Sequence, residues 1–249
     1  MTETRRLLLF PDLESHQQKK NPFPRKRGRK PLPWRQGAPH RKRVTFTSWS
    51  ALHVTLSLRP GLPSLRNWAC IGSALRAFRA CKEKEDFRIL AWTIQSNHLH
   101  LVVEAGSSLA LTRNLQGLQV RLAKGWNRLW KRKSPVFAGR FHARLVGPKE
   151  DPRRLLAYVL KNHMRHGRVD GPCFDGASSS LWMDVWLERD LWERERGRMG
   201  IGQGPVPVAE PKTEGMKAAL RPGALSLFGR PRGYNRVEFL RASEVEGEK

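Results

Sequence analysis

The segment Gln95–Val103 (QSNHLHLVV) constrains the fold of this chain more than any other part of the sequence. Successive side chains of a β-strand point to opposite faces, so His98 and His100 share one face here. The opposite face is apolar and carries Leu99, Leu101 and Val103. Because an apolar face is stable only when it is covered, the segment predicts a strand whose leucine side packs on helices and whose imidazoles stand on the uncovered side.

The hydrophobic pattern around this segment alternates between strand and helix periodicity. We predict strands at His53–Leu58, Phe87–Ile94, Leu99–Val103 and (interrupted by Gly139) Val136–Val146, and helices at Trp68–Phe78, Leu111–Leu129 and 152–166. The last helix follows from Asp151 as N-cap, Pro152 as first residue and Gly167 as stop. Without it the order is βαββαβ, which predicts an α+β fold of the ferredoxin-like type, an antiparallel sheet with two helices on one face. The added helix is expected against or beside the open face.

Both ends of the chain differ in composition from this central region. Residues 19–43 contain several prolines and no acid, and such a stretch cannot bury enough apolar surface to fold alone. From about residue 197 onward, Gly, Pro and mixed charge occur without sustained periodicity, apart from a short helix expected near Glu214–Leu220. We predict a disordered basic arm over 1–45, one folded domain over 46–190 and a low-complexity tail over 191–249.

The net charge indicates the kind of partner. The chain has 47 Lys and Arg against 22 Asp and Glu, a formal charge of +25. Nucleic acid is the expected partner, because each cation on a phosphate releases condensed counterions. An anionic membrane surface is the competing partner, but no apolar run approaches the roughly 18 residues of a spanning helix, so we expect no membrane association. The expected phosphate contacts are Arg27, Arg29, Lys30, Arg140, Lys161 and Arg165.

Two further patterns concern the basic arm and the cysteines. The arm segment Arg25–Pro31 either enters an A/T-rich minor groove or binds phosphates without regard to sequence. Cys70, Cys81 and Cys173 form neither a CxxC pair nor a zinc spacing, which is typical of reduced thiols in the cytoplasm. We therefore expect a cytoplasmic, nucleoid-associated protein.

The histidine pair has two interpretations. Two imidazoles on one strand face are natural ligands for a divalent metal ion, but they can equally be polar surface residues. Zinc is the less suitable metal, because no further Cys or His stands at an obvious spacing nearby. An oxygen ligand together with a substrate phosphate would suit Mg²⁺ or Mn²⁺.

Tyr158 and Asn162 form a second candidate pair. They are four residues apart in the predicted helix and therefore lie on one of its faces. A phenol and an amide on an exposed basic face can act as nucleophile and metal ligand, whereas burial of the tyrosine ring in an amphipathic helix is the alternative. Several tryptophans are open to a similar choice between base stacking and core packing: Trp92, Trp126, Trp130 and Trp182.

The two pairs together carry a family resemblance. SNHLHLVVEA followed by LLAYVLKNHMRHGRV resembles the HUH single-tyrosine transposases, most closely the REP-associated tyrosine transposases. The similarity runs from about His53 to Trp182, with the tyrosine after the histidines, whereas relaxases place it before them. The sequence departs from the family at His163, where a proline is usual after the asparagine, and at Ala177, where an aromatic residue is usual.

The resemblance implies a reaction and a site. His98, His100 and Asn162 would hold Mg²⁺ or Mn²⁺, and Tyr158 would be the nucleophile. The activity implied is cleavage and transfer of single-stranded or hairpin DNA through a 5′-phosphotyrosine. A catalytically silent domesticated transposase that binds hairpins is the alternative. An RNA-recognition module is disfavoured by the lack of an RNP-like aromatic run, and a zinc hydrolase is a third class. The sequence leaves monomer and homodimer open, and also whether Tyr158 serves its own subunit.

Overall fold

A computed structural model describes residues 44–147, 149–165, 174–201 and 206–226 of the 249-residue chain. All of them belong to the second of the two units into which the chain divides, residues 37–249. The predicted arm, with Arg27, Arg29 and Lys30, lies outside the described residues, as does the tail beyond residue 226.

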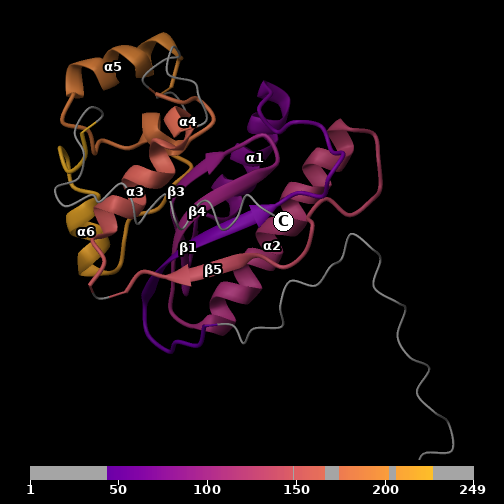
Figure 1. Ribbon diagram of the computed structural model, residues 1–249, viewed down its shortest axis with the longest axis horizontal. Helices are drawn as coiled ribbons and strands as arrows, with labels where there is room; N and C mark the ends of the chain where they lie inside the picture. Colours follow the sequence, from indigo (N-terminus) through magenta and orange to yellow (C-terminus); the bar gives the residue numbers. More distant parts are fainter. Residues whose placement is uncertain (1–43, 148, 166–173, 202–205, 227–249) are drawn as a thin grey trace, which may run out of the picture. The chain divides into compact units, whose positions relative to one another are not determined.

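The centre of the described region is a five-stranded antiparallel sheet in the order β2-β3-β4-β1-β5 (Figure 1). The strands are β1 (Ser50–Ser57), β2 (Glu83–Lys84), β3 (Phe87–Ile94), β4 (His98–Ala105) and β5 (His142–Leu145). Together with the helices, this sheet confirms the predicted α+β class. The strand predicted over Val136–Val146 is too long. Its first part makes only an isolated bridge between Phe137 and Leu58, and regular pairing with β1 begins after Gly139.

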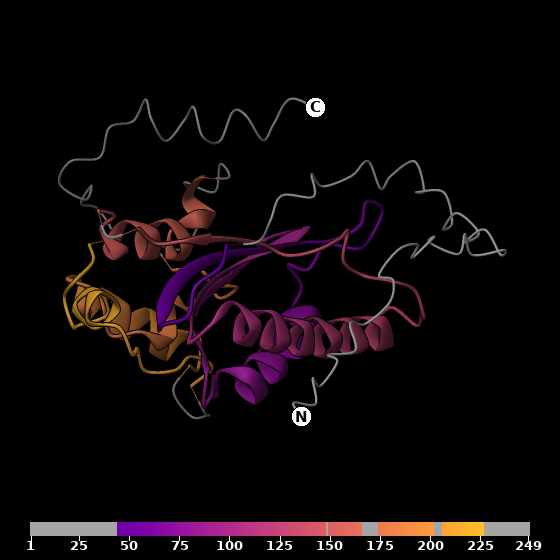
Figure 2. The same ribbon diagram turned by 90° about the horizontal axis from the view of Figure 1, so that it is seen from below.

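Helices α1 (Trp68–Cys81) and α2 (Ser108–Leu129) cover one face of the sheet (Figure 2). Asparagine and serine caps start them: Asn67 Oδ1 accepts from the Cys70 N–H, and Ser107 Oγ accepts from the Ala110 N–H. The apolar side of β4 packs in this layer, as its alternation predicts. The shared core includes Leu99, Leu101, Val103, Phe78, Leu115, Leu122 and Trp126.

The opposite face is covered in part by α3 (Pro152–Leu160), which Figure 2 shows across the sheet from α1 and α2. A shift of register between Ile89 and Ala91 places the consecutive residues Leu90 and Ala91 in the core under α3. An extra residue in one strand locally redirects side chains in this way. The second core also contains Val102, Leu155, Leu156, Val159 and Leu160. Helix α3 therefore packs on the face of the sheet opposite to α1 and α2.

The predicted helix over 152–166 is wrong in one respect, because it is not continuous. Asp151 Oδ1 accepts from the Arg153 N–H and α3 begins at Pro152 as expected, but α3 ends at Leu160. Lys161 follows with ψ of 13°, far from the helical value of about −42°. A short helix α4 (Asn162–Arg165) then begins. Tyr158 and Asn162 consequently lie on two consecutive helices instead of one.

The chain after η1 (Ser179–Trp182) continues to pack against the domain. Helix α5 (Arg189–Arg198) crosses the domain boundary expected at residue 190. Helix α6 (Glu214–Ala219) is the short helix expected near Glu214–Leu220. Met216 and Ala219 of α6 are buried against the second core, as is Leu225. Residues 206–226 therefore form part of the folded structure, in contrast to the expected low-complexity tail. None of the helices in the described ranges has the length and apolar character of a membrane span.

Candidate active site

His98 and His100 stand side by side at the start of β4. Their Nε2 atoms lie 3.1 Å apart, and their rings meet edge to face. Asn97 Oδ1 lies 2.8 Å from His98 Nδ1. An amide oxygen can only accept, so this contact assigns a proton to Nδ1 of His98, and in the neutral ring the lone pair is then on Nε2. The pair therefore presents nitrogen atoms that can act as ligands, as the period-two spacing predicted.

His53 and Thr55 of β1 reach His100 from the neighbouring strand. Thr55 lies opposite His100 in the register, with Oγ1 3.3 Å from His100 Nδ1. His53 Nε2 lies 3.0 Å from the same nitrogen, and the two rings stack with centroids 5.0 Å apart. Burial, together with the positive charge of Arg144 and the neighbouring His142, lowers the pKa of His53 to about 4. The His53 ring is therefore neutral at neutral pH.

Sequence reasoning treated His53 only as the first residue of a strand and did not identify it as a site residue. The signal was present, because His53 and Thr55 alternate with Val54 and Leu56 in the same way that the histidines of β4 alternate with leucines. His142 and Arg144 on β5 were also missed. They pair with Thr55 and His53 in the register and continue the polar face to the edge of the sheet.

Tyr158 lies beside His100 and His53. Its ring centroid is 5.4 Å from that of His100 and 5.6 Å from that of His53, both in edge-to-face geometry. The ring is half-buried, and α3 is held in place by its leucine and valine side chains in the second core. The fold thus brings the phenol ring of α3 to the histidine face of the sheet.

Asn162 is almost completely buried, with 2% of its surface exposed. Its Oδ1 atom is buried and has no hydrogen-bond partner among the described residues. A buried carbonyl oxygen without a partner costs roughly 1–3 kcal/mol, and a ligand at this position is one way to offset that cost. The departure from the family pattern, His163, is buried next to it.

The donor atoms fit a divalent cation. Metal–imidazole bonds of about 2.0–2.1 Å place two nitrogens on one ion about 3.0–3.4 Å apart, and the Nε2 pair has this spacing. The side chain of Asn162 carries an oxygen of the kind that Mg²⁺ and Mn²⁺ accept. In the part of the chain that the structure describes, no three His, Cys, Asp or Glu side chains cluster to hold a metal ion.

The expected phosphate-binding residues differ in their environment. Arg140 is exposed in the loop before β5. Lys161 is partly buried and its Nζ donates to the backbone oxygen of Ser226, 2.9 Å away. Arg165 lies in α4, and its side chain is outside the described part. Two of the tryptophans considered for base stacking, Trp92 and Trp126, are fully buried in the first core.

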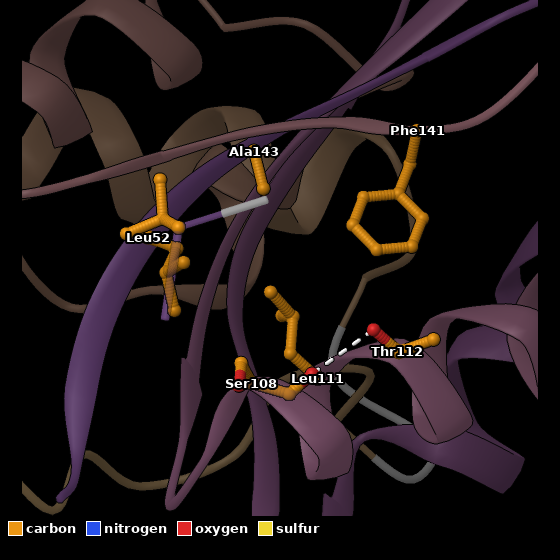
Figure 3. Close-up of a pocket in the computed structure, with 7 residues that line it drawn as sticks. Leu52, Ser108, Leu111, Thr112, Phe141 and Ala143 are labelled. Carbon is orange, nitrogen blue, oxygen red and sulfur yellow. Dashed lines mark hydrogen bonds between the residues drawn. The ribbon is translucent and has the colours of Figure 1, made fainter. Parts of the chain in front are cut away.

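A small pocket on the other side of the sheet contains none of these residues. It lies between α2 and the strands β1 and β5, and Figure 3 shows the side chains of Leu52, Leu111 and Phe141 around it. Thr112 Oγ1 donates to the backbone oxygen of Ser108 at its edge. The pocket wall consists of apolar groups and hydroxyls, in contrast to the imidazole face.

Comparisons with known proteins find similarity among solved structures. No protein-family model matches the chain, and a search of curated proteins finds no significant match. Among solved structures, the chain is similar to a REP-associated tyrosine transposase bound to a REP hairpin, with 17% sequence identity and a TM-score of 0.47. The similarity covers 70% of this chain and 92% of that one. The function of this chain is therefore inferred from its own side chains.

Proposed function

We propose that this protein is a transposase that cleaves single-stranded DNA and transfers the strand, with Tyr158 as the nucleophile. The observation that carries the proposal is the edge-to-face contact of Tyr158 with His100, whose Nε2 lies 3.1 Å from that of His98. A phenol ring in contact with His100 brings a nucleophile to one of the two proposed histidine ligands. The motif order in the sequence, histidines first and tyrosine later, supports the same assignment.

His98, His100 and Asn162 would hold Mg²⁺ or Mn²⁺. The facing Nε2 atoms and the buried Oδ1 of Asn162 without a hydrogen-bond partner support this set of ligands. When bound, such a cation supplies Lewis-acid stabilisation of the charge that develops on a scissile phosphate. The protein's own contribution is to hold the ligands on β4 and at the start of α4 while α3 presents the tyrosine.

The reaction is a transesterification. Tyr158 Oη forms a bond to phosphorus, and the bond from phosphorus to the 3′ oxygen breaks. The departing 3′ oxygen keeps the electron pair and takes up one proton, which balances the proton lost by the phenol. The products are a 5′-phosphotyrosine and a free 3′-hydroxyl. Because one phosphate ester replaces another, a 3′-hydroxyl can reverse the step and join strands without ATP.

The fold and the charge support this proposal. The order β1-α1-β3-β4-α2-β5, with strand order β3-β4-β1-β5 within the sheet, supports assignment to the ferredoxin-like type. We assign residues 46–190 to the catalytic domain, with α6 packed against its tyrosine helix. We assign the arm over 1–45 to DNA affinity and residues 191–249 to a C-terminal extension. The net charge of +25 and the exposed Arg140 suit single-stranded or hairpin DNA as the substrate. Monomer and homodimer both remain compatible with the site.

The test is the formation of a covalent adduct. The full-length protein is incubated with Mn²⁺ and a 5′-labelled or 3′-labelled single strand that carries a hairpin, and the products are separated on a denaturing gel. We expect an adduct with the 3′-labelled strand only, because the tyrosine retains the 5′-phosphate. Tyr158→Phe keeps the ring contact with His100 and should form none.

Other outcomes distinguish the alternatives. An adduct that persists in Tyr158→Phe excludes this nucleophile. Hairpin binding that is unaffected by chelator and by His100→Ala, with no adduct under any condition, identifies a DNA-binding protein that does not cleave. Stoichiometric zinc in the purified protein would support a zinc hydrolase instead.

A further inference from the structure

We propose that His53 is a positioning residue for His100: it accepts a hydrogen bond from His100 Nδ1 and thereby directs the lone pair of His100 Nε2 toward the bound cation. This inference rests on the proposed function, since it concerns the cation held by His98 and His100. His53 lies on β1, outside the histidine motif, and no part of the resemblance assigns it a role.

The argument starts from the proton on His98. Asn97 Oδ1 accepts from His98 Nδ1 over 2.8 Å, so the neutral His98 ring has its lone pair on Nε2. His100 Nε2 lies 3.1 Å from it. If His100 Nε2 also carried a lone pair with no cation present, two lone pairs would face each other at hydrogen-bond distance. In the metal-free protein, His100 Nε2 therefore carries a proton and donates it to His98.

The position of the proton on His100 determines the direction of the hydrogen bond between His53 and His100. With its proton on Nε2, His100 has a lone pair on Nδ1, and His53 Nε2, 3.0 Å away, must donate to it. A bound cation needs the lone pairs of both His98 Nε2 and His100 Nε2. The proton of His100 must then sit on Nδ1, and His53 Nε2 must accept it. The contact between His53 and His100 is satisfied in both states, with its direction reversed.

No net proton is gained or lost in this change. The proton of His100 moves from Nε2 to Nδ1, and the proton of His53 moves from Nε2 to Nδ1 through exchange with water. The total charge of the two rings does not change. An imidazole is suited to this role because its nitrogen can either donate or accept, whereas a carboxylate only accepts and an ammonium group only donates.

The packing supports His53 over Thr55 as the main partner. Thr55 Oγ1 is 3.3 Å from His100 Nδ1, longer than the 3.0 Å contact of His53. The His53 ring also stacks on His100 with an interplanar angle of 29° and meets Tyr158 edge-on. His53 therefore contacts both the proposed ligand His100 and the proposed nucleophile Tyr158. Its stacking restricts the orientation of the His100 ring.

Cation affinity of the full-length protein provides the first test. Mn²⁺ binding is measured from the free-ion EPR signal for the wild type, His53→Phe, His53→Gln and Thr55→Val. His53→Phe keeps a planar ring but cannot accept, so we expect its affinity to fall about 10- to 100-fold, as for other groups that orient metal ligands. His53→Gln keeps an acceptor and should recover most of the affinity. Thr55→Val should have the smaller effect. Wild-type affinity in His53→Phe would overturn the inference.

The tautomer of His100 gives a second readout that a structural role alone would not change. In ¹⁵N-histidine-labelled wild type, we expect His100 to carry its proton on Nε2 without metal and on Nδ1 after addition of Mg²⁺. This experiment needs no variant, so it decides the point even if His53→Phe fails to fold. A proton that stays on His100 Nε2 while Mg²⁺ binds would refute the inference and leave the proposed function standing. A wild type that binds neither ion would refute both.

Discussion

Glu104 on β4 accepts hydrogen bonds from both the backbone N–H and the hydroxyl of Thr213, and from the N–H of Lys212. The Glu104 side chain is completely buried. Its carboxylate thus holds the residues that lead into α6, and α6 packs with α3, the helix that carries Tyr158. A buried group more than one hundred residues away in sequence from its partner therefore joins the C-terminal segment to the sheet that bears the site.

Glu104→Gln is expected to destabilise the protein by about 1–3 kcal/mol, because one acceptor oxygen becomes an NH₂ group that faces a backbone N–H. Urea unfolding followed by circular dichroism measures the change. Glu150→Gln is the matched control, since Glu150 is an exposed acid paired with Arg144. Its cost should stay below about 1 kcal/mol. Equal effects for the two variants would contradict the role of Glu104.

Asn162→Asp is expected to lower the stability of the metal-free protein and to increase the stabilisation that Mn²⁺ provides. A carboxylate at this buried position is costly without a counter-ion, whereas it is a better ligand for Mn²⁺ than an amide. The melting temperature in EDTA should fall, and the rise on adding Mn²⁺ should exceed that of the wild type.

Asn127→Asp is the control for that experiment. Asn127 Oδ1 is also buried without a hydrogen-bond partner in the described part of the chain, but it lies on α2, on the other side of the sheet. This variant should lose stability in EDTA and show no added response to Mn²⁺. A similar Mn²⁺ response in both variants would mean that Asn162 is not a ligand.

Asp175→Asn tests the ion pair that anchors the segment after residue 174. Arg66 donates to both carboxylate oxygens of Asp175 over 2.9 and 2.7 Å and also to the backbone oxygen of Ile94. Asp175 is 5% exposed. Removing one partner of a buried pair costs roughly 3–5 kcal/mol, because the other charge stays buried. The double variant Arg66→Met/Asp175→Asn should be less destabilised than Asp175→Asn alone, and the reverse order in chemical denaturation would exclude this explanation.

Lys161→Met and Arg140→Met should distinguish a basic side chain that stabilises the fold from one that binds DNA phosphates. Lys161 Nζ donates to Ser226 O, whereas Arg140 is exposed. Arg140→Met should reduce the slope of log affinity against log salt by about 1 for a single-stranded oligonucleotide and leave stability unchanged. Lys161→Met should lower the melting temperature with a smaller effect on the slope. If Lys161→Met changes only the slope, Lys161 contacts DNA as the sequence predicts.

The sequence by itself determined the features that depend on neighbouring residues. Alternation places His98 and His100 on one face of β4 and Leu99 on the other, because consecutive strand residues point in opposite directions. Asp151 and Pro152 likewise start α3, since capping is a local hydrogen bond followed by a compatible backbone angle.

Only the tertiary structure decided the features that depend on register and on packing between distant segments. His53 reaches His100 because β1 pairs with β4 in a register that places Thr55 opposite His100. The turn at Lys161, which ends α3 before Asn162, accompanies a hydrogen bond from Lys161 to Ser226. No local pattern encodes such contacts, because they join residues far apart in sequence. The composition after residue 190 predicts a tail, yet a few buried side chains, such as Met216, are sufficient to hold that segment against α3.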